Sequence, residues 1–276
     1  MTLLDDARTL LPDAIDLRRR LHRHPEIGNH LPRTRETVLG ALEGLPLELH
    51  LHETTSGIAA VLRGATDGPT VLLRGDMDAL AMPEDTGLPF ASEVDGAMHA
   101  CGHDLHTAML ATAARLLSER RDELVGNVVF MFQPGEEGHH GARFMLDEGL
   151  LDVVDPAPSG AFAIHVTSWF APGTVSHLAG PQMASADTIH VTVTGRGGHA
   201  SAPFLAADPI PAAAETVLAV ETALTRAMNP FDPAVVTFGR FATGTTDNVI
   251  PQTAELMGTM RTFSEETREM GQGLIR

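Results

Sequence analysis

The sequence predicts an α/β protein with a second, smaller α+β part. Through the first ~180 residues, helical apolar spacing alternates with short, branched-rich apolar runs bounded by glycine and proline, the pattern of buried strands connected by helices. The order then becomes strand, helix, strand, strand, helix, one strand short of a split βαβ repeat. We expect one domain over 1–183, with a largely parallel mixed sheet, and a second, ferredoxin-like domain over 184–276.

The elements of the first domain are predicted one by one. Leucines at helical spacing indicate a helix over 3–23 that Pro25 ends. Asp104 is expected to be the N-cap of a later helix that runs to Arg120. Two more helices are expected over 34–43 and 141–150. Buried strands are expected over 57–64, 70–75, 127–132 and 161–164.

The second domain has a different pattern. Ile189, Val191 and Val193 alternate with polar residues, which predicts a half-exposed strand. Asp208 followed by Pro209 is a typical helix start. The elements expected are a strand over 188–195, a helix over 208–228, strands over 234–241 and 253–263, and a helix that begins at Ser264.

Composition excludes several classes of protein. The formal net charge of −17 disfavours nucleic acid and anionic membranes as partners. All 19 basic residues are arginine, so neither lysine nucleophiles nor a P-loop is available. "GRGGHA" at 195–200 lacks the spacing of a dinucleotide fingerprint. A single cysteine, short apolar runs and no signal-peptide pattern lead us to expect a cytoplasmic protein with no membrane segment.

Polar side chains follow three of the predicted strands at the point where each ends. Asp76 and Asp78 follow the second strand, Glu136 and Glu137 follow the third, and His165 follows the fourth. Ligands of open α/β sheets bind outside the carboxyl ends of the strands. We therefore expect these side chains to converge, together with the "CGHD" turn before a helix.

A thiol, imidazoles and carboxylates are metal ligands, and this set suits zinc, manganese, cobalt or nickel. Cys101 and His103 are two residues apart in a turn, so both can face one ion. Glu136 and Glu137 are neighbours whose side chains diverge, so one can bind metal while the other acts as general base. Ordinary alternatives remain: a buried apolar cysteine, a solvated "GEEG" turn, and "DMD" as a helix cap.

The chain resembles the hippurate hydrolase and indoleacetyl-amino-acid hydrolase branch of the aminoacylase and carboxypeptidase-G superfamily of metallopeptidases. The resemblance covers essentially its whole length. Its motifs are "LHRHPEIGNHLPRTRET", "LLRGDMDALAMPEDTGLPFAS", "MHACGHDLHTAML", "VVFMFQPGEEGHHGARFML", "AIHV", "GRGGHASAPFLAADPI" and "TDNVIPQTAELMGTMRTF". It implies a metallopeptidase-type catalytic domain over 1–183, a lid and dimerisation domain over 184–276, and a metal-dependent amidohydrolase cleaving N-acyl or N-aroyl amino acids.

The resemblance also implies roles for residues of the first domain. Glu136 matches the general base, and Asp78 matches an aspartate that orients a metal-binding histidine. Asp76 stands where the superfamily usually has a histidine ligand, for which the cysteine compensates. His106 is either a supporting residue or a solvent-exposed histidine at the start of a helix. The ligands implied for two divalent ions (Mn²⁺, Zn²⁺, Co²⁺ or Ni²⁺) are Cys101, His103, Glu137 and His165.

In the second domain, His199 matches a histidine that reaches the partner subunit's site in a homodimer and stabilises the oxyanion. Asn248 and Arg261 match positions that hold the substrate, and a guanidinium suits a free carboxylate. For Arg261 the alternative is a surface charge at a strand end.

One departure from the family matters. Family members continue for roughly a hundred residues and supply one further histidine ligand, whereas this sequence ends at Arg276. We therefore expect a C-terminally truncated second domain, and a chain that alone binds metal weakly and hydrolyses slowly or not at all. The alternatives are an N-acetyl-diaminopimelate deacetylase, a dipeptidase, or an inactive metal-binding or dimerisation module.

Overall fold

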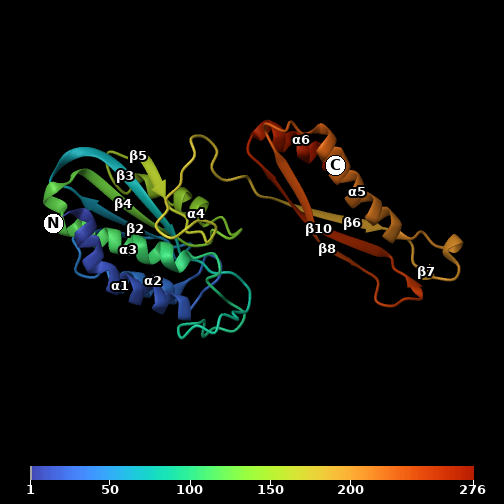
Figure 1. Cartoon of the computed structure of the whole chain (residues 1–276), viewed down its shortest axis with the longest axis horizontal. Helices are drawn as coiled ribbons and strands as arrows, with labels where there is room; N and C mark the ends of the chain where they lie inside the picture. Colours follow the sequence, from blue (N-terminus) through green and yellow to red (C-terminus); the bar gives the residue numbers. More distant parts are fainter. Residues whose placement is uncertain (1) are drawn as a thin grey trace. The chain divides into compact units, whose positions relative to one another are not determined.

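The computed structural model describes residues 2–276. The chain divides into two compact units, the first ending at Pro172 and the second running from Gly173 to Arg276 (Figure 1). The domain roles expected from the sequence, with their boundary at 183/184, remain predictions. No helix within residues 2–276 is both long and apolar enough to cross a membrane.

A five-stranded mixed sheet forms the centre of the first unit. Its strand order is β1-β2-β4-β3-β5, and β3 runs parallel to both β4 and β5. β2 is antiparallel to both β1 and β4, so the sheet is mixed, as predicted, with β2 as the one reversed strand. The strands are β1 (Glu48–Leu51), β2 (Ile58–Arg63), β3 (Thr66–Asp76), β4 (Val125–Gln133) and β5 (Pro158–Ala163).

The short connection from β2 to β3 explains the antiparallel part. Only Gly64 and Ala65 separate these strands, whereas a parallel connection needs a crossover of about a dozen residues or more. The chain therefore reverses, and β4 inserts between the two strands. β1 was not predicted, because all four of its residues are exposed and no buried face marks it in the sequence.

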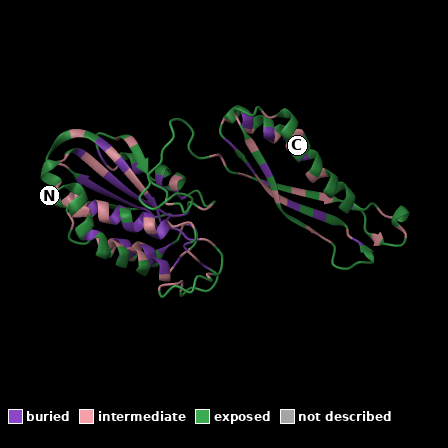
Figure 2. Ribbon diagram, in the orientation of Figure 1, coloured by how far each residue is buried: buried purple, intermediate pink, exposed green. Residues whose placement is uncertain are grey.

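Helices cover both faces of the sheet. α1 (Leu3–Arg23), α2 (Pro32–Leu42) and α3 (His103–Glu119) pack on one face (Figure 1). α4 (Gly141–Asp147) and the short helix η2 (Leu150–Asp152) pack on the other. Because both faces are covered, the inner strands form the most buried part of the unit (Figure 2).

α3 begins at His103, one residue before the predicted cap. The N-cap is Gly102 in the left-handed conformation, with φ 87°, where glycine is favoured. A Cβ on Gly102 would lie 2.5 Å from Val166 Cγ2, so the turn also leaves no space for a side chain. Asp104 therefore lies inside the first turn, fully buried, and the prediction that it caps the helix is wrong.

Replacing Phe130 by alanine is expected to lower the free energy of unfolding of the first unit by about 3–5 kcal/mol. Phe130 lies on β4, is fully buried, and contacts the cluster formed by the sheet and α1 to α3. Denaturant unfolding followed by circular dichroism measures the change. Phe231→Ala is the control, because Phe231 is exposed and its loss should change stability by less than about 0.5 kcal/mol. Equal effects of the two changes would contradict the packing described.

The second unit has the predicted order of strand, helix, strand, strand, helix. Its antiparallel sheet has the order β6-β10-β8, and α5 and α6 pack against it. Two short strands, β7 (Gly198–His199) and β9 (Val249–Ile250), pair separately. The main elements are β6 (Asp187–Thr194), α5 (Pro209–Ala227), β8 (Ala234–Thr243), β10 (Thr253–Thr262) and α6 (Glu265–Ile275).

β5 is an edge strand. In the described chain it pairs with β3 alone, and its other side is open. Phe162 in this strand is 63% exposed, and Ile164 just beyond it is 66% exposed. The sheet therefore ends at an apolar edge.

Candidate metal centre

Three neighbouring parallel strands bring the predicted polar residues together at their carboxyl ends in the first unit's sheet. Asp76 ends β3, the Glu136-Glu137 pair follows β4, and His165 follows β5. The turn that carries Cys101, just before the start of α3, lies at the same end of the sheet. Three overlapping groups could hold a metal ion: Cys101, His103 and His165; Asp76, His103 and His106; and His103, Glu136 and Glu137.

His103 belongs to all three groups and is fully buried. Its Nδ1 lies 3.4 Å from Asp78 Oδ1, and its Nε2 lies 3.5 Å from Asp76 Oδ2. Within residues 2–276, neither ring nitrogen has an aligned hydrogen bond. Burial lowers the pKa of His103, but Asp78, Cys101 and Asp76 outweigh it and raise the pKa to about 11. The surrounding groups therefore strongly favour a positive charge at this point.

Asp78 fixes the turn that carries the two glutamates. Its Oδ1 accepts a hydrogen bond from the Glu136 backbone N–H, and its Oδ2 accepts one from the Glu137 N–H, both at 3.0 Å. A Cβ on Gly141 would lie 1.7 Å from the Pro134 carbonyl oxygen, so the chain packs closely around this turn. Two hydrogen bonds and close packing therefore define the backbone of the turn.

The two glutamates differ in their surroundings. The side chain of Glu136 is 42% exposed and that of Glu137 is 27% exposed. Oε2 of Glu136 and Oε1 of Glu137 both lie 3.9 Å from Nε2 of His103. Partial burial, and then the charges of Glu137 and Asp76, raise the pKa of Glu136. Glu136 is thus a carboxylate with increased affinity for a proton.

Cys101 and His165 face each other. The distance from Cys101 Sγ to His165 Nε2 is 3.5 Å. With its proton on Nδ1, His165 donates a hydrogen bond to the Val166 carbonyl oxygen at 2.7 Å. That leaves the lone pair of Nε2 directed at the thiol, in position to share an ion with it.

Asp76 is a fully buried carboxylate with two partners that the sequence did not predict. His106 Nδ1 lies 2.5 Å from its Oδ1, and Arg74 Nη1 lies 2.7 Å from its Oδ2. Burial raises the pKa of Asp76, but His106, His103 and Arg74 outweigh it and lower the pKa to about 2. His106 is buried, so the solvent-exposed alternative is wrong. Arg74 could have been found from its place two residues before Asp76, on the same strand face.

A second buried network lies beside His103. Asp104 Oδ2 lies 2.8 Å from His22 Nδ1 and forms an ion pair with Arg18 Nε at 2.7 Å. The other ring nitrogen of His22, Nε2, lies 3.2 Å from Glu84 Oε1. These contacts tie α1 to the first turn of α3 and to the loop after β3. Their components come from segments far apart in the sequence, and no local pattern predicted them.

The donor set fits a divalent metal. Both buried ring nitrogens of His103 lack aligned hydrogen bonds, which is costly unless another group satisfies them. A thiol, imidazoles and carboxylates match the preferences of zinc and its neighbours. Of the residues predicted in the first unit, Asp78, Cys101, His103, Glu136, Glu137 and His165 all lie in this cluster.

The residues predicted in the second unit do not form one cluster. Asn248 directly precedes β9, and its carbonyl oxygen accepts a hydrogen bond from Ala200 N at 3.1 Å, next to His199 in β7. His199 Nδ1 lies 2.7 Å from Ser201 Oγ. Arg261 is exposed near the other end of β10, eight residues from Thr253, or ~27 Å along the strand.

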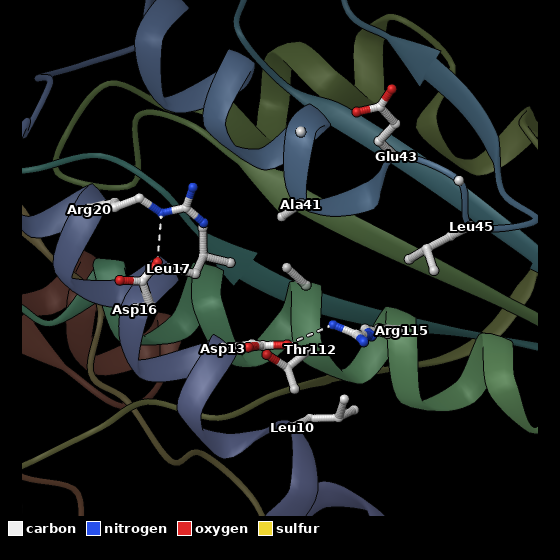
Figure 3. A pocket seen from close by; sticks show the side chains of 13 residues that line it. Leu10, Asp13, Asp16, Leu17, Arg20, Ala41, Glu43, Leu45, Thr112 and Arg115 are labelled. Carbon is white, nitrogen blue, oxygen red and sulfur yellow. Dashed lines mark hydrogen bonds and ion pairs between the residues drawn. The ribbon is translucent and has the colours of Figure 1, made fainter.

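A hollow of about 480 Å³ lies elsewhere, between α1, α2 and α3 (Figure 3). Two ion pairs lie among the residues that line it: Asp13 with Arg115 at 2.9 Å, and Asp16 with Arg20 at 3.3 Å. None of the residues that line it is a predicted site residue. The hollow is therefore separate from the candidate metal centre.

Fold and site together place the chain among α/β proteins with a candidate metal centre at the carboxyl ends of parallel strands. The chain belongs to peptidase family M20/M25/M40, whose sequence model matches residues 72–264. This finding confirms the family predicted from the motifs.

The chain is also similar in sequence to individual proteins over most of its length. The chain is 42% identical to the N-acetylcysteine deacetylase of Bacillus subtilis (strain 168), over 92% of its own length and 66% of that protein's. It is 40% identical to IAA-amino acid hydrolase ILR1-like 4 of Arabidopsis thaliana, over 92% of its own length and 56% of that protein's. The chain thus spans less than two thirds of these curated relatives.

A solved structure agrees with the fold. The YXEP protein of Bacillus subtilis, described as a dinuclear metal-binding peptidase of the M20 family, is 36% identical with a TM-score of 0.74. The match covers 97% of this chain and 71% of that one.

Proposed function

We propose that the chain carries the metal centre and general base of an amidohydrolase that cleaves N-acyl amino acids. The observation that carries this proposal is the paired glutamate turn, which Asp78 holds beside a buried histidine that a thiol and a second imidazole also approach. The names of two relatives support the substrate class, because N-acetylcysteine and IAA-amino acids both join an acyl group to an amino acid through an amide.

The residues proposed to hold two divalent ions are Cys101, His103, Glu137 and His165. Mn²⁺, Zn²⁺, Co²⁺ and Ni²⁺ all suit this mixed donor set. When bound, such ions supply Lewis acidity to the amide carbonyl and to the attacking water. The description of the YXEP protein as dinuclear supports two ions in preference to one.

Glu136 is the proposed general base. It takes a proton from water and later delivers it to the leaving amine, which requires a carboxylate with raised proton affinity. The pKa of Glu136 is raised by burial, by Glu137 and by Asp76. Asp78 has a supporting role, because it anchors the backbone of the turn and faces the His103 ring.

The second unit is proposed to complete the site in a homodimer. His199 stabilises the oxyanion, while Asn248 and Arg261 hold the substrate, with the guanidinium on its free carboxylate. The position of Arg261, ~27 Å along β10 from the end next to β9, supports a dimer. One substrate molecule is too small to contact both ends of one unit, so two copies would share each site.

Chelator-sensitive release of glycine from N-benzoylglycine is the expected result with the full 276-residue chain and added Mn²⁺. Parallel reactions with N-acetylcysteine, N-acetyl-diaminopimelate and a dipeptide identify which amide is cleaved fastest. A dipeptide or N-acetyl-diaminopimelate as best substrate would replace the acyl-amino-acid proposal by one of the alternatives. Metal uptake without hydrolysis of any of the four would contradict the enzymatic proposal and favour a metal-binding module.

A further inference from the structure

His106 uses both of its ring nitrogens within the protein. The Val166 backbone N–H donates a hydrogen bond to His106 Nε2 at 2.9 Å. A nitrogen that accepts this bond carries no proton, so the ring is neutral and its proton is on Nδ1. The protonated Nδ1 then donates to Asp76 Oδ1 at 2.5 Å. Geometry therefore defines one tautomer.

This arrangement excludes His106 as a metal ligand, although it lies within reach of Asp76 and His103. A ligand needs a free lone pair, and the only lone pair of this ring is directed at the Val166 N–H. Both oxygens of Asp76 also have partners, because Arg74 Nη1 lies 2.7 Å from Oδ2.

The backbone of Val166 connects His106 to the opposite side of the cluster. Its N–H, in the peptide group shared with His165, donates to His106, and its carbonyl oxygen, in the next peptide group, accepts the Nδ1–H of His165. The His106 ring also packs edge-on against the His165 ring, with centroids 4.6 Å apart. The orientation of His165 Nε2 toward Cys101 therefore depends on where His106 holds this backbone.

We propose that His106 is a positioning residue that, held by Asp76, fixes the backbone at Val166 and thereby aims His165 Nε2 at Cys101. Thr107 reinforces the arrangement, since its hydroxyl donates to the Asp76 carbonyl oxygen at 2.8 Å and joins α3 to the end of β3. The link to metal binding rests on the proposed function, in which Cys101 and His165 are ligands.

Two substitutions test the two hydrogen bonds of the His106 ring one at a time. The amide of asparagine reaches the position of Nδ1, and the amide of glutamine reaches that of Nε2. His106→Gln therefore keeps an acceptor for Val166, whereas His106→Asn keeps only the contact with Asp76. His190→Asn is the matched control, because His190 is exposed on β6.

Co²⁺ titration provides a readout other than activity, because thiolate coordination gives a near-ultraviolet charge-transfer band. We expect His106→Asn to lower Co²⁺ affinity about 10- to 100-fold and weaken that band, as loss of a ligand-orienting partner typically does. His106→Gln should stay within about threefold of the wild type, and His190→Asn should match it. Wild-type affinity and an unchanged band in His106→Asn would overturn the proposal.

Nitrogen-15 NMR of the metal-free wild-type chain tests the same inference without any substitution. His106 should show a protonated Nδ1 and an unprotonated Nε2, coupled to the Val166 N–H. A protonated Nε2 would overturn the proposal even if His106→Asn failed to fold. The expected tautomer together with no thiolate band in the wild type would leave the His106 link standing and contradict the ligand assignment in the proposed function.

Discussion

Glu136→Gln is expected to lower kcat for N-acyl amino acids by about 10²–10⁴-fold while leaving divalent metal affinity within about twofold. Glutamine keeps the shape of the side chain but cannot accept a proton from water. The backbone N–H of residue 136 would still donate to Asp78, so the turn should keep its position. Steady-state kinetics measured beside metal titration by calorimetry separate the two effects.

Glu221→Gln is the control for this change, because Glu221 is an exposed residue of α5 in the second unit. It should leave both turnover and metal binding unchanged. Loss of metal binding together with turnover in Glu136→Gln would mean that the roles of Glu136 and Glu137 are interchanged. Unchanged turnover would remove Glu136 from the mechanism.

His103→Ala is expected to reduce metal affinity by more than about 100-fold. His103 belongs to both groups that remain once His106 is excluded, the one with Cys101 and His165 and the one with Glu136 and Glu137. Its loss leaves Asp76 and Asp78 facing an empty space lined by carboxylates. Loss of a residue that only orients a metal ligand typically costs 10–100-fold in affinity, so loss of His103, the proposed shared ligand, should exceed that range. Metal content after dialysis, measured by mass spectrometry of the eluted ions, provides the readout.

Cooperative unfolding of metal-free His103→Ala should be measured in parallel, so that loss of affinity is not confused with loss of structure. His190→Ala serves as the control, since that exposed side chain belongs to the other unit. Retention of two equivalents of metal with wild-type affinity would show that the centre lies elsewhere.

The position of the site could be predicted because it follows from strand direction. Asp76 and Glu136 come after buried apolar runs, and the three strands concerned are parallel neighbours. His165 follows β5, where the expectation of a buried strand over 161–164 is wrong, because these residues are exposed on an edge strand. The direction of β2 was not predictable from its own residues, because five of its six residues are buried and show no alternation to indicate which neighbour it pairs with. The short connection at Gly64 was the only available signal.

The supporting contacts were harder to predict than the site itself. Arg74, His106 and Val166 act through bonds between β3, α3 and the segment after β5, and each bond depends on tertiary packing. A histidine in the first turn of a helix is equally compatible with solvent and with burial. The close approach of β3 to α3 at Gly75, where a Cβ would lie 2.9 Å from the His106 carbonyl oxygen, decides between them.

The open edge of β5 bears on how any dimer of this protein should be interpreted. An unpaired apolar strand is a template for a strand of another molecule, and pairing of this kind would join two copies through their first units. The dimer proposed for catalysis depends instead on His199 in the second unit. A lysine in place of the exposed Phe162 should block the first kind of association and spare the second. Self-association that disappears on Phe162→Lys is therefore edge-to-edge aggregation, and only association that survives it supports a shared active site.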